Sequence, residues 1–120
     1  MGALNILPDE IHAECWGNAA NIKTQITKTG KSVTTFSIQY GKNGDNKLYQ
    51  NCVAWGDLSR KFLNRLEKGD LVAVKGFIEK DDYWSERKGT DEYKIIVEIA
   101  YVQELYDSDD IDEELDLNDI

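Results

Sequence analysis

One short stretch with helical periodicity interrupts a chain that otherwise has the pattern of β-strands. Leu58, Phe62 and Leu66 recur every four residues, which is the spacing of an apolar stripe on an α-helix. Asp57 suits the N-cap position before this stripe, and Gly69 suits the position that ends a helix. A single helix at this place restricts the fold to those that insert one helix into a series of strands.

Strand-like runs separated by turns occupy the chain on both sides of this helix. Proline is nearly absent, whereas β-branched and aromatic residues occur throughout. Phe36, Ile38 and Tyr40, for example, alternate with polar residues as in a half-buried strand. The predicted strands cover residues 11–16, continuing at 21–26 after a bend at Gly17-Asn18, and then 32–40, 47–55, 71–80 and 92–105. Residues 41–46 are predicted as a hairpin loop and residues 81–91 as a charged loop.

The order of these elements is three strands, one helix and two strands. A helix between the third and fourth strands is the arrangement of the OB-fold, a small Greek-key barrel that binds oligonucleotides on one face. We therefore expect a mainly β protein built on a five-stranded OB-fold barrel with one helix.

Charge divides the chain into two regions. The formal net charge is −9, but residues 107–120 hold eight acids and no base, which leaves 15 acids and 14 bases in residues 1–106. We expect a folded domain at 1–106 and a disordered acidic C-terminal tail at 107–120. A nearly neutral domain cannot bind a nucleic acid by bulk charge, so it would need local lysines and a contact such as base stacking.

The sequence offers little support for an enzyme or a metal site. His12 is the one histidine, and no carboxylate pair, nucleophile motif or phosphate-binding glycine loop stands out. His12 and Cys15 are three residues apart on a predicted strand, so they point to opposite faces and do not suit zinc. We expect no enzymatic activity, no metal and no cofactor.

Cellular location is inferred from the absence of targeting signals. No apolar run approaches the ~18–20 residues that cross a bilayer, and the first residues lack the pattern of a secretory signal. We expect a cytoplasmic protein, in which Cys15 and Cys52 are reduced and buried as small hydrophobic residues.

Four stretches of the chain carry distinctive motifs: Asn-Cys-Val-Ala-Trp-Gly at residues 51–56, and the runs at residues 30–38, 62–76 and 93–105. In their order and spacing these stretches resemble the bacterial and phage single-stranded-DNA-binding proteins, and residues 51–56 are similar to the end of the third strand of that family. Residues 11–18 are a looser match. The resemblance implies a homo-oligomer, dimeric or tetrameric, that binds single-stranded DNA without sequence preference and protects it during replication, recombination and repair.

The resemblance also implies which aromatic residues stack on bases. Tyr49 and Trp55 match the stacking aromatics of the family; they are six residues apart on one strand, so they share a face at a separation of about 20 Å. Hydrophobicity alone leaves open whether this face or the opposite one forms the core. Tyr83 matches another stacking position, with Trp84 beside it, although a subunit contact or a ring folded back on the barrel is the alternative for both. Tyr40 is a further candidate.

Lysines near these aromatics are candidates for phosphate contacts. Each of them alone would more often be a solvated surface residue, so only the set is informative. The set comprises Lys23, Lys42, Lys47, Lys75 and Lys80.

The acidic tail combines carboxylates with apolar residues at its end. The resemblance implies that such a tail docks on replication, recombination and repair proteins, here through Asp116, Leu117, Asp119 and Ile120. The chain departs from the bacterial pattern because it ends in Asn-Asp-Ile instead of Pro-Phe and lacks a long linker rich in Gly, Pro and Gln. These departures suggest a phage or prophage member. A purely solubilising extension is the alternative for the tail.

Two other functions are compatible with the same fold. One is an OB-fold module that binds proteins, and the other is an OB-fold protein that binds RNA. Titration with single-stranded DNA, duplex DNA and RNA discriminates among the three.

Overall fold

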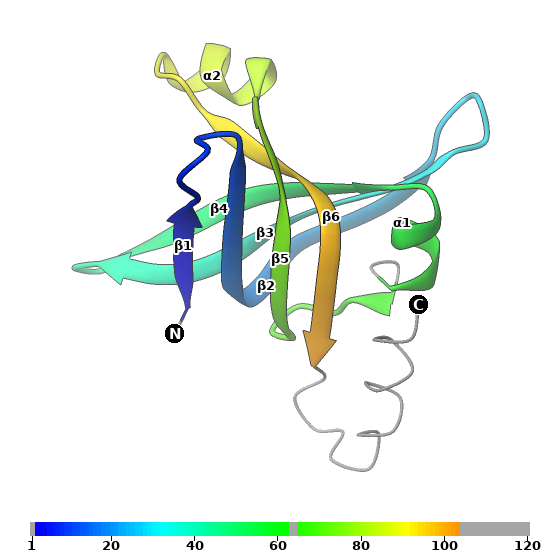
Figure 1. The fold of residues 1–120 in the computed structure, drawn as a ribbon, viewed down its shortest axis with the longest axis horizontal. Coiled ribbons are helices and arrows are strands. Elements are labelled where there is room, and N and C mark those ends of the chain that lie inside the picture. Colours follow the sequence, from blue (N-terminus) through cyan, green and yellow to red (C-terminus); the bar gives the residue numbers. More distant parts are fainter. Residues whose placement is uncertain (1, 63–64, 104–120) are drawn as a thin grey trace.

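The computed structural model describes residues 2–62 and 65–103. Within them the chain forms strands and two short helices (Figure 1). In chain order these are β1 (Ala3–Ile6), β2 (His12–Ile26), β3 (Ser32–Asn43), β4 (Asn46–Trp55), α1 (Asp57–Lys61), β5 (Leu71–Lys80), α2 (Asp82–Lys88) and β6 (Tyr93–Gln103). The predicted mainly β fold is confirmed. No helix in the described ranges has the length and apolar composition needed to cross a membrane.

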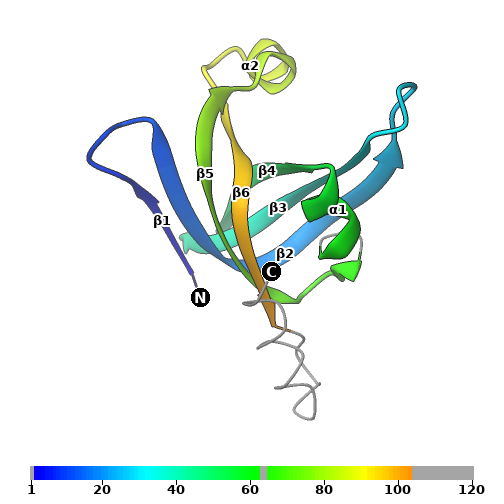
Figure 2. The ribbon, with the colours of Figure 1, turned by 45° about the vertical axis from the view of Figure 1, so that its right-hand side comes forward.

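Five of the strands pair in a closed ring. The order of neighbours is β2, β3, β4, β6 and β5, and β5 pairs again with β2. All of these pairs are antiparallel except β4 with β6. Strand β2 closes the ring because its first half pairs with β5 and its second half with β3, and Asn18 has a partner in both. Figure 2 shows the sharp bend of β2 that this double pairing requires.

The interior of the ring is filled by small and medium apolar side chains. Phe36 of β3 is in register with Cys52 of β4, and Ile38 of β3, Val72 of β5 and Ile95 of β6 belong to the same buried cluster. The expectation of two buried, unpaired cysteines is confirmed. Burial raises the pKa of Cys15 to about 12, and burial together with the nearby Cys15 raises the pKa of Cys52 well above its usual value.

Two glycines allow the strands to approach closely where the ring closes. A Cβ atom on Gly17 of β2 would lie 2.1 Å from the carbonyl oxygen of Gln39, and one on Gly76 of β5 would lie 1.9 Å from that of Ile96. Both distances are far below van der Waals contact with backbone atoms that cannot easily move. A side chain at either position would therefore force the paired strands apart.

The helix between β4 and β5 differs from the prediction. Asp57 is the first helical residue, Gly56 is the N-cap with φ 65°, and α1 ends at Lys61, so the predicted cap and length were wrong. The segment near Gly69 is held by β2 instead of by the helix: the Gly69 amide donates to the carbonyl of Ala19, and the Ala19 amide donates to that of Asp70. These tertiary hydrogen bonds replace the helical turn that the periodicity predicted.

Four further boundaries correct the sequence analysis. Strand β1 was not predicted, and it exists because all its residues pair with β2. Strand β2 runs through Gly17-Asn18, and its irregularity lies between Ala20 and Lys23. The hairpin turn is narrower than the predicted loop, since residues 41–43 pair with 46–48. The predicted loop at 81–91 contains α2, so the chain has a second helix.

Candidate nucleic-acid interface

Tyr49 and Trp55 lie on the outer face of β4. Their side chains are 45% and 48% exposed, whereas Cys52 and Ala54 on the opposite face are buried in the core. The question that hydrophobicity left open is therefore answered, because ring closure places the smaller side chains inside. Both aromatic rings are accessible to a ligand.

A row of hydrogen-bonded polar side chains crosses the outer face between these two rings. The Ser37 hydroxyl of β3 donates to Oδ1 of Asn51 on β4 at 2.8 Å, and Nδ2 of Asn21 on β2 donates to the Ser37 hydroxyl at 3.4 Å. This row fixes the orientation of the Asn51 amide between Tyr49 and Trp55. The outer face is thus an ordered surface with aromatic rings at two places and polar groups between them.

Three of the five candidate lysines lie on this same face. Lys47 is two residues before Tyr49 on β4, and its direct partner across the hairpin is Lys42. Like charges directly opposite each other in a sheet are unfavourable, and an anion between them removes the repulsion. Lys23 of β2 is in register with Thr35, which is in turn in register with Val53 of β4, so it belongs to the same face.

Lys75, Lys80 and Tyr40 are not brought together with this group. Lys75 is in register with Glu14 of β2 and Ile99 of β6, on the other side of the ring. Lys80 forms an ion pair with Asp91 at 3.5 Å. Tyr40 lies at the bulge between Gln39 and Gly41 and packs, partly buried, against the core.

Tyr83 and Trp84 lie on α2, on the surface as expected. They are 59% and 39% exposed, and their rings form an edge-to-face pair with centroids 5.2 Å apart. Local sequence forms the helix: the Asp81 carboxylate accepts from the Trp84 amide at 3.2 Å, and Gly89 ends the helix with φ 72°. This Asp and Gly pair was the signal that could have predicted α2.

A second exposed aromatic region lies on the outer face of β2, β5 and β6. Trp16 is in register with Ala73, which is in register with Tyr101, and Phe77 and Ile99 are exposed nearby. Sequence pattern left open whether Trp16, Phe77 and Tyr101 lie in the core or at an interface, and their exposure excludes the core. We call this group the β2–β5–β6 apolar face.

His12 lies at the edge of the β2–β5–β6 apolar face, between two carboxylates. Its Nδ1 is 2.7 Å from Oδ2 of Asp9, its Nε2 is 3.4 Å from Oε1 of Glu98, and its ring packs on Phe77. In the described part of the chain no group of three or more His, Cys, Asp or Glu residues is arranged to hold a metal ion. Through these contacts His12 of β2 links the preceding turn to β6.

Comparison with known proteins points to one family. The model of the single-strand binding protein family matches residues 12–105. The wild-type single-stranded DNA binding protein from Thermus aquaticus has a similar structure, with a TM-score of 0.62 and 16% sequence identity over 78% of this chain and 40% of that chain. A deletion mutant of the same Thermus aquaticus protein gives a TM-score of 0.61 and 17% identity, with the same coverage of both chains.

This chain therefore spans about 40% of the length of those two structures, and at such low identity the likeness concerns the fold alone. A search of curated protein sequences finds no match.

Proposed function

Since the chain belongs to the single-strand binding protein family, we propose that it binds single-stranded DNA without sequence preference on the outer face of β3 and β4. The ring of five strands then serves as the OB-fold barrel. The observation that carries the proposal is the placement of Tyr49 and Trp55, two half-exposed rings on one face of β4. Packing of the core does not explain aromatic side chains at positions 49 and 55, because both point outward.

The physical basis of such binding is stacking combined with local charge. A base that stacks on an aromatic side chain contributes roughly 1–3 kcal/mol whatever its identity, because every base has a π-face. Lys42 and Lys47 form a local positive centre two residues from Tyr49, and Lys23 supplies a third cation on the same face. Bases on the rings and phosphates on these lysines explain how a nearly neutral domain binds a polyanion.

The other predicted contacts take subordinate places in this proposal. Tyr83 and Trp84 on α2 provide a second stacking region. Tyr40, Lys75 and Lys80 face other surroundings, and we expect smaller effects from changing them. The tail residues Asp116, Leu117, Asp119 and Ile120 lie outside the described residues, and recruitment of replication, recombination and repair proteins through them is part of the proposal.

Self-association is also part of the proposal. The β2–β5–β6 apolar face exposes Trp16, Phe77, Ile99 and Tyr101, and large exposed apolar groups of this kind mark interaction surfaces. Strand β1 offers an additional pairing edge, because its partner in the described sheet is β2 alone. We propose that copies of the chain associate through this side and leave the outer face of β3 and β4 free for DNA.

Fluorescence titration with oligo-dT, a mixed-sequence single strand, duplex DNA and RNA tests the proposal. We expect strong quenching of tryptophan emission by both DNA single strands, with similar affinities, and much weaker binding of duplex. Equal affinity for duplex and single strand would contradict it. Tighter binding of RNA than of DNA would favour the RNA-binding alternative, and no binding of any nucleic acid would favour a protein-binding module.

A further inference from the structure

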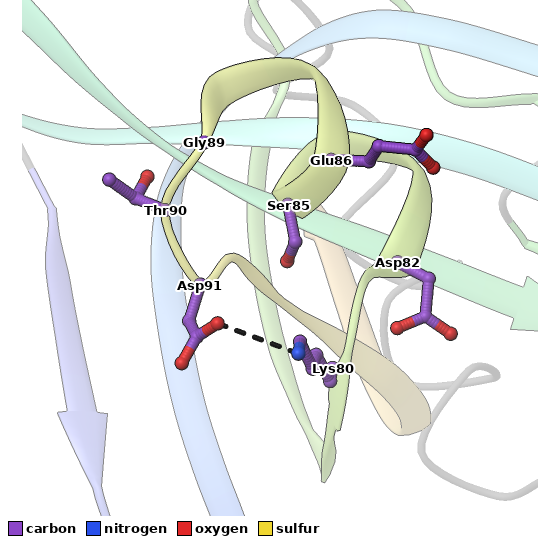
Figure 3. Close-up of a pocket in the computed structure, with 7 residues that line it drawn as sticks. All are labelled: Lys80, Asp82, Ser85, Glu86, Gly89, Thr90 and Asp91. Carbon is purple, nitrogen blue, oxygen red and sulfur yellow. Dashed lines mark ion pairs between the residues drawn. The ribbon is translucent and has the colours of Figure 1, made fainter.

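Helix α2 has two chemically different halves. With about 100° between successive residues, Tyr83, Trp84, Arg87 and Lys88 fall on one half, and Asp82, Ser85 and Glu86 fall on the other. The acidic half lines a pocket of about 460 Å³ under the helix, together with Lys80 and Asp91 (Figure 3). The half with the aromatic and basic residues therefore faces away from this pocket.

The acidic half attaches α2 to the rest of the protein. The Ser85 hydroxyl accepts from the Glu92 amide at 2.7 Å and donates to the Glu92 carbonyl at 3.3 Å. Lys80 and Asp91 form an ion pair at 3.5 Å across the base of the pocket (Figure 3). These contacts fix the helix while none of its side chains is buried. The aromatic half is thus held in place without being covered.

Each aromatic residue of α2 has a cation four positions later. The guanidinium carbon of Arg87 lies 5.2 Å from the centroid of the Tyr83 ring, and Nζ of Lys88 lies 5.7 Å from that of Trp84. The two cations differ in their further partners. Lys88 pairs with Oε1 of Glu92 at 3.1 Å, whereas Arg87 has no carboxylate partner among the described residues. Tyr83 is also the more exposed of the two rings.

We propose that Tyr83 and Arg87 form a nucleotide-binding unit, in which Tyr83 stacks on a base and Arg87 binds an adjacent phosphate. Trp84, the second ring of this stacking region, also supports the helix together with Lys88: Trp84 meets the Tyr83 ring edge to face, and Lys88 links the Trp84 ring to Glu92. The guanidinium suits the phosphate because its planar fork donates two parallel hydrogen bonds to one anion. This inference rests on the proposed single-strand binding and extends it to Arg87.

The substitution R87Q tests the unit, and K88Q is its matched control on the same helix. If Arg87 neutralises one phosphate, the plot of log affinity against log salt should be less steep for R87Q than for wild type, by about 0.7. Lowering the salt from 1 M to 0.1 M should then increase the affinity of R87Q about fivefold less than that of wild type. K88Q should change the slope much less, because Glu92 already neutralises Lys88. R87K should retain most of the slope.

An oligothymidine with a neutral methylphosphonate backbone separates a phosphate contact from support of the ring. We expect wild type and R87Q to bind this oligomer equally. If R87Q weakens binding of the neutral oligomer as much as binding of ordinary DNA, the phosphate contact is wrong. It is also wrong if R87Q and K88Q reduce the affinity for ordinary DNA equally.

The same measurements separate this inference from the proposed function. If R87Q binds ordinary DNA like wild type while Trp55→Ala weakens binding, the proposed role of Tyr83 and Arg87 is wrong and the proposed function stands. If wild type does not bind single-stranded DNA at all, the proposed function fails and the unit fails with it. Thermal melting of R87Q should match wild type, since Arg87 is exposed.

Discussion

At the scale of single residues, two tryptophans of similar exposure have different environments. Trp55 is 48% exposed on β4, on the same face as Val53 and the hydrogen-bonded side chain of Asn51. Trp16 is 43% exposed on the β2–β5–β6 apolar face. Exposure alone does not distinguish a ligand contact from a subunit contact. The position of each residue in the ring of strands determines its neighbours, and we base the expected role of each tryptophan on that position.

We therefore predict opposite effects of two matched substitutions. Trp55→Ala should weaken binding of oligo-dT by about 1–3 kcal/mol, because it removes one stacking platform. Trp16→Ala should leave that affinity nearly unchanged and reduce self-association, which light scattering coupled to gel filtration measures. A Trp55→Ala protein that melts early but binds normally when folded would show that Trp55 has a structural role.

The turn between β1 and β2 contains a carboxylate whose pKa depends on the fold. Asp9 accepts backbone hydrogen bonds from His12 and Ile11 through Oδ1, and its Oδ2 contacts the His12 ring. The bonds from His12, followed by that from Ile11, lower the pKa of Asp9 from 3.8 to about 2. A lowered pKa in the folded state means that the ionised carboxylate favours folding.

This contribution should be complete above about pH 4 and should disappear as the pH falls towards 2. Between pH 4 and pH 2, the melting temperature of wild type should consequently fall further than that of Asp9→Asn. Asp45→Asn, in the β3–β4 turn, removes a carboxylate without a hydrogen bond to any described residue and is the control. Parallel curves for wild type and Asp9→Asn would show that the Asp9 contacts do not stabilise the folded state.

At the scale of elements, α1 is attached by polar contacts as well as by its apolar stripe. The Ser59 hydroxyl is fully buried and lies 2.8 Å from the Ser32 hydroxyl and 2.7 Å from that of Thr34, both on β3. Thr34 also contacts the Thr24 hydroxyl of β2 at 3.0 Å. These hydroxyls connect the helix to two strands of the ring near Trp55, where β4 ends.

Replacing Ser59 with alanine should reduce the free energy of unfolding by about 1–3 kcal/mol, because a buried hydroxyl on Ser32 loses its partner. Urea denaturation measures this value. The same replacement in a Ser32→Ala background should cost less, since the partner is already absent. Additive effects of the two substitutions would mean that the hydrogen bond between them contributes little.

At the scale of the whole molecule, charge is separated along the sequence. The first 106 residues are close to neutral, whereas residues 107–120 contribute eight acids. DNA repels such a segment, and the lysines around Tyr49 attract it. We therefore expect the tail to compete with DNA, and we propose that its apolar residues Leu117 and Ile120 act as anchors on partner proteins.

Deleting residues 107–120 should leave the melting temperature unchanged and leave DNA affinity equal or higher at low salt, because an internal competitor is removed. It should also abolish capture of a replication or recombination partner from lysate. Changing Leu117 and Ile120 to serine with every charge retained separates anchoring from electrostatics. If the full-length protein captures nothing that the truncated protein misses, the tail is a solubilising extension.

Local sequence pattern predicts much of the fold. Alternation along residues 47–55 was sufficient to place Tyr49 and Trp55 on one face and Cys52 and Ala54 on the other, because side chains of a strand alternate with a period of two. The bounds of β5 agree with the predicted strand. The order of β2 to β6 along the chain and the presence of a helix between β4 and β5 likewise followed from local sequence pattern.

Tertiary structure alone decided which of these faces is outside and which lysines accompany the aromatic rings. Both faces of β4 carry apolar residues, and only the closed ring, with room for small side chains inside, selects between them. Lys47 and Lys75 have equivalent sequence signals, but the pairing of β3 with β4 and of β2 with β5 places them on different sides of the ring. Strand β1 depends on its pairing with β2, and the segment at Gly69 and Asp70 depends on hydrogen bonds to Ala19 of β2. The bonds to Ala19 join residues far apart in sequence, so no local pattern encodes them.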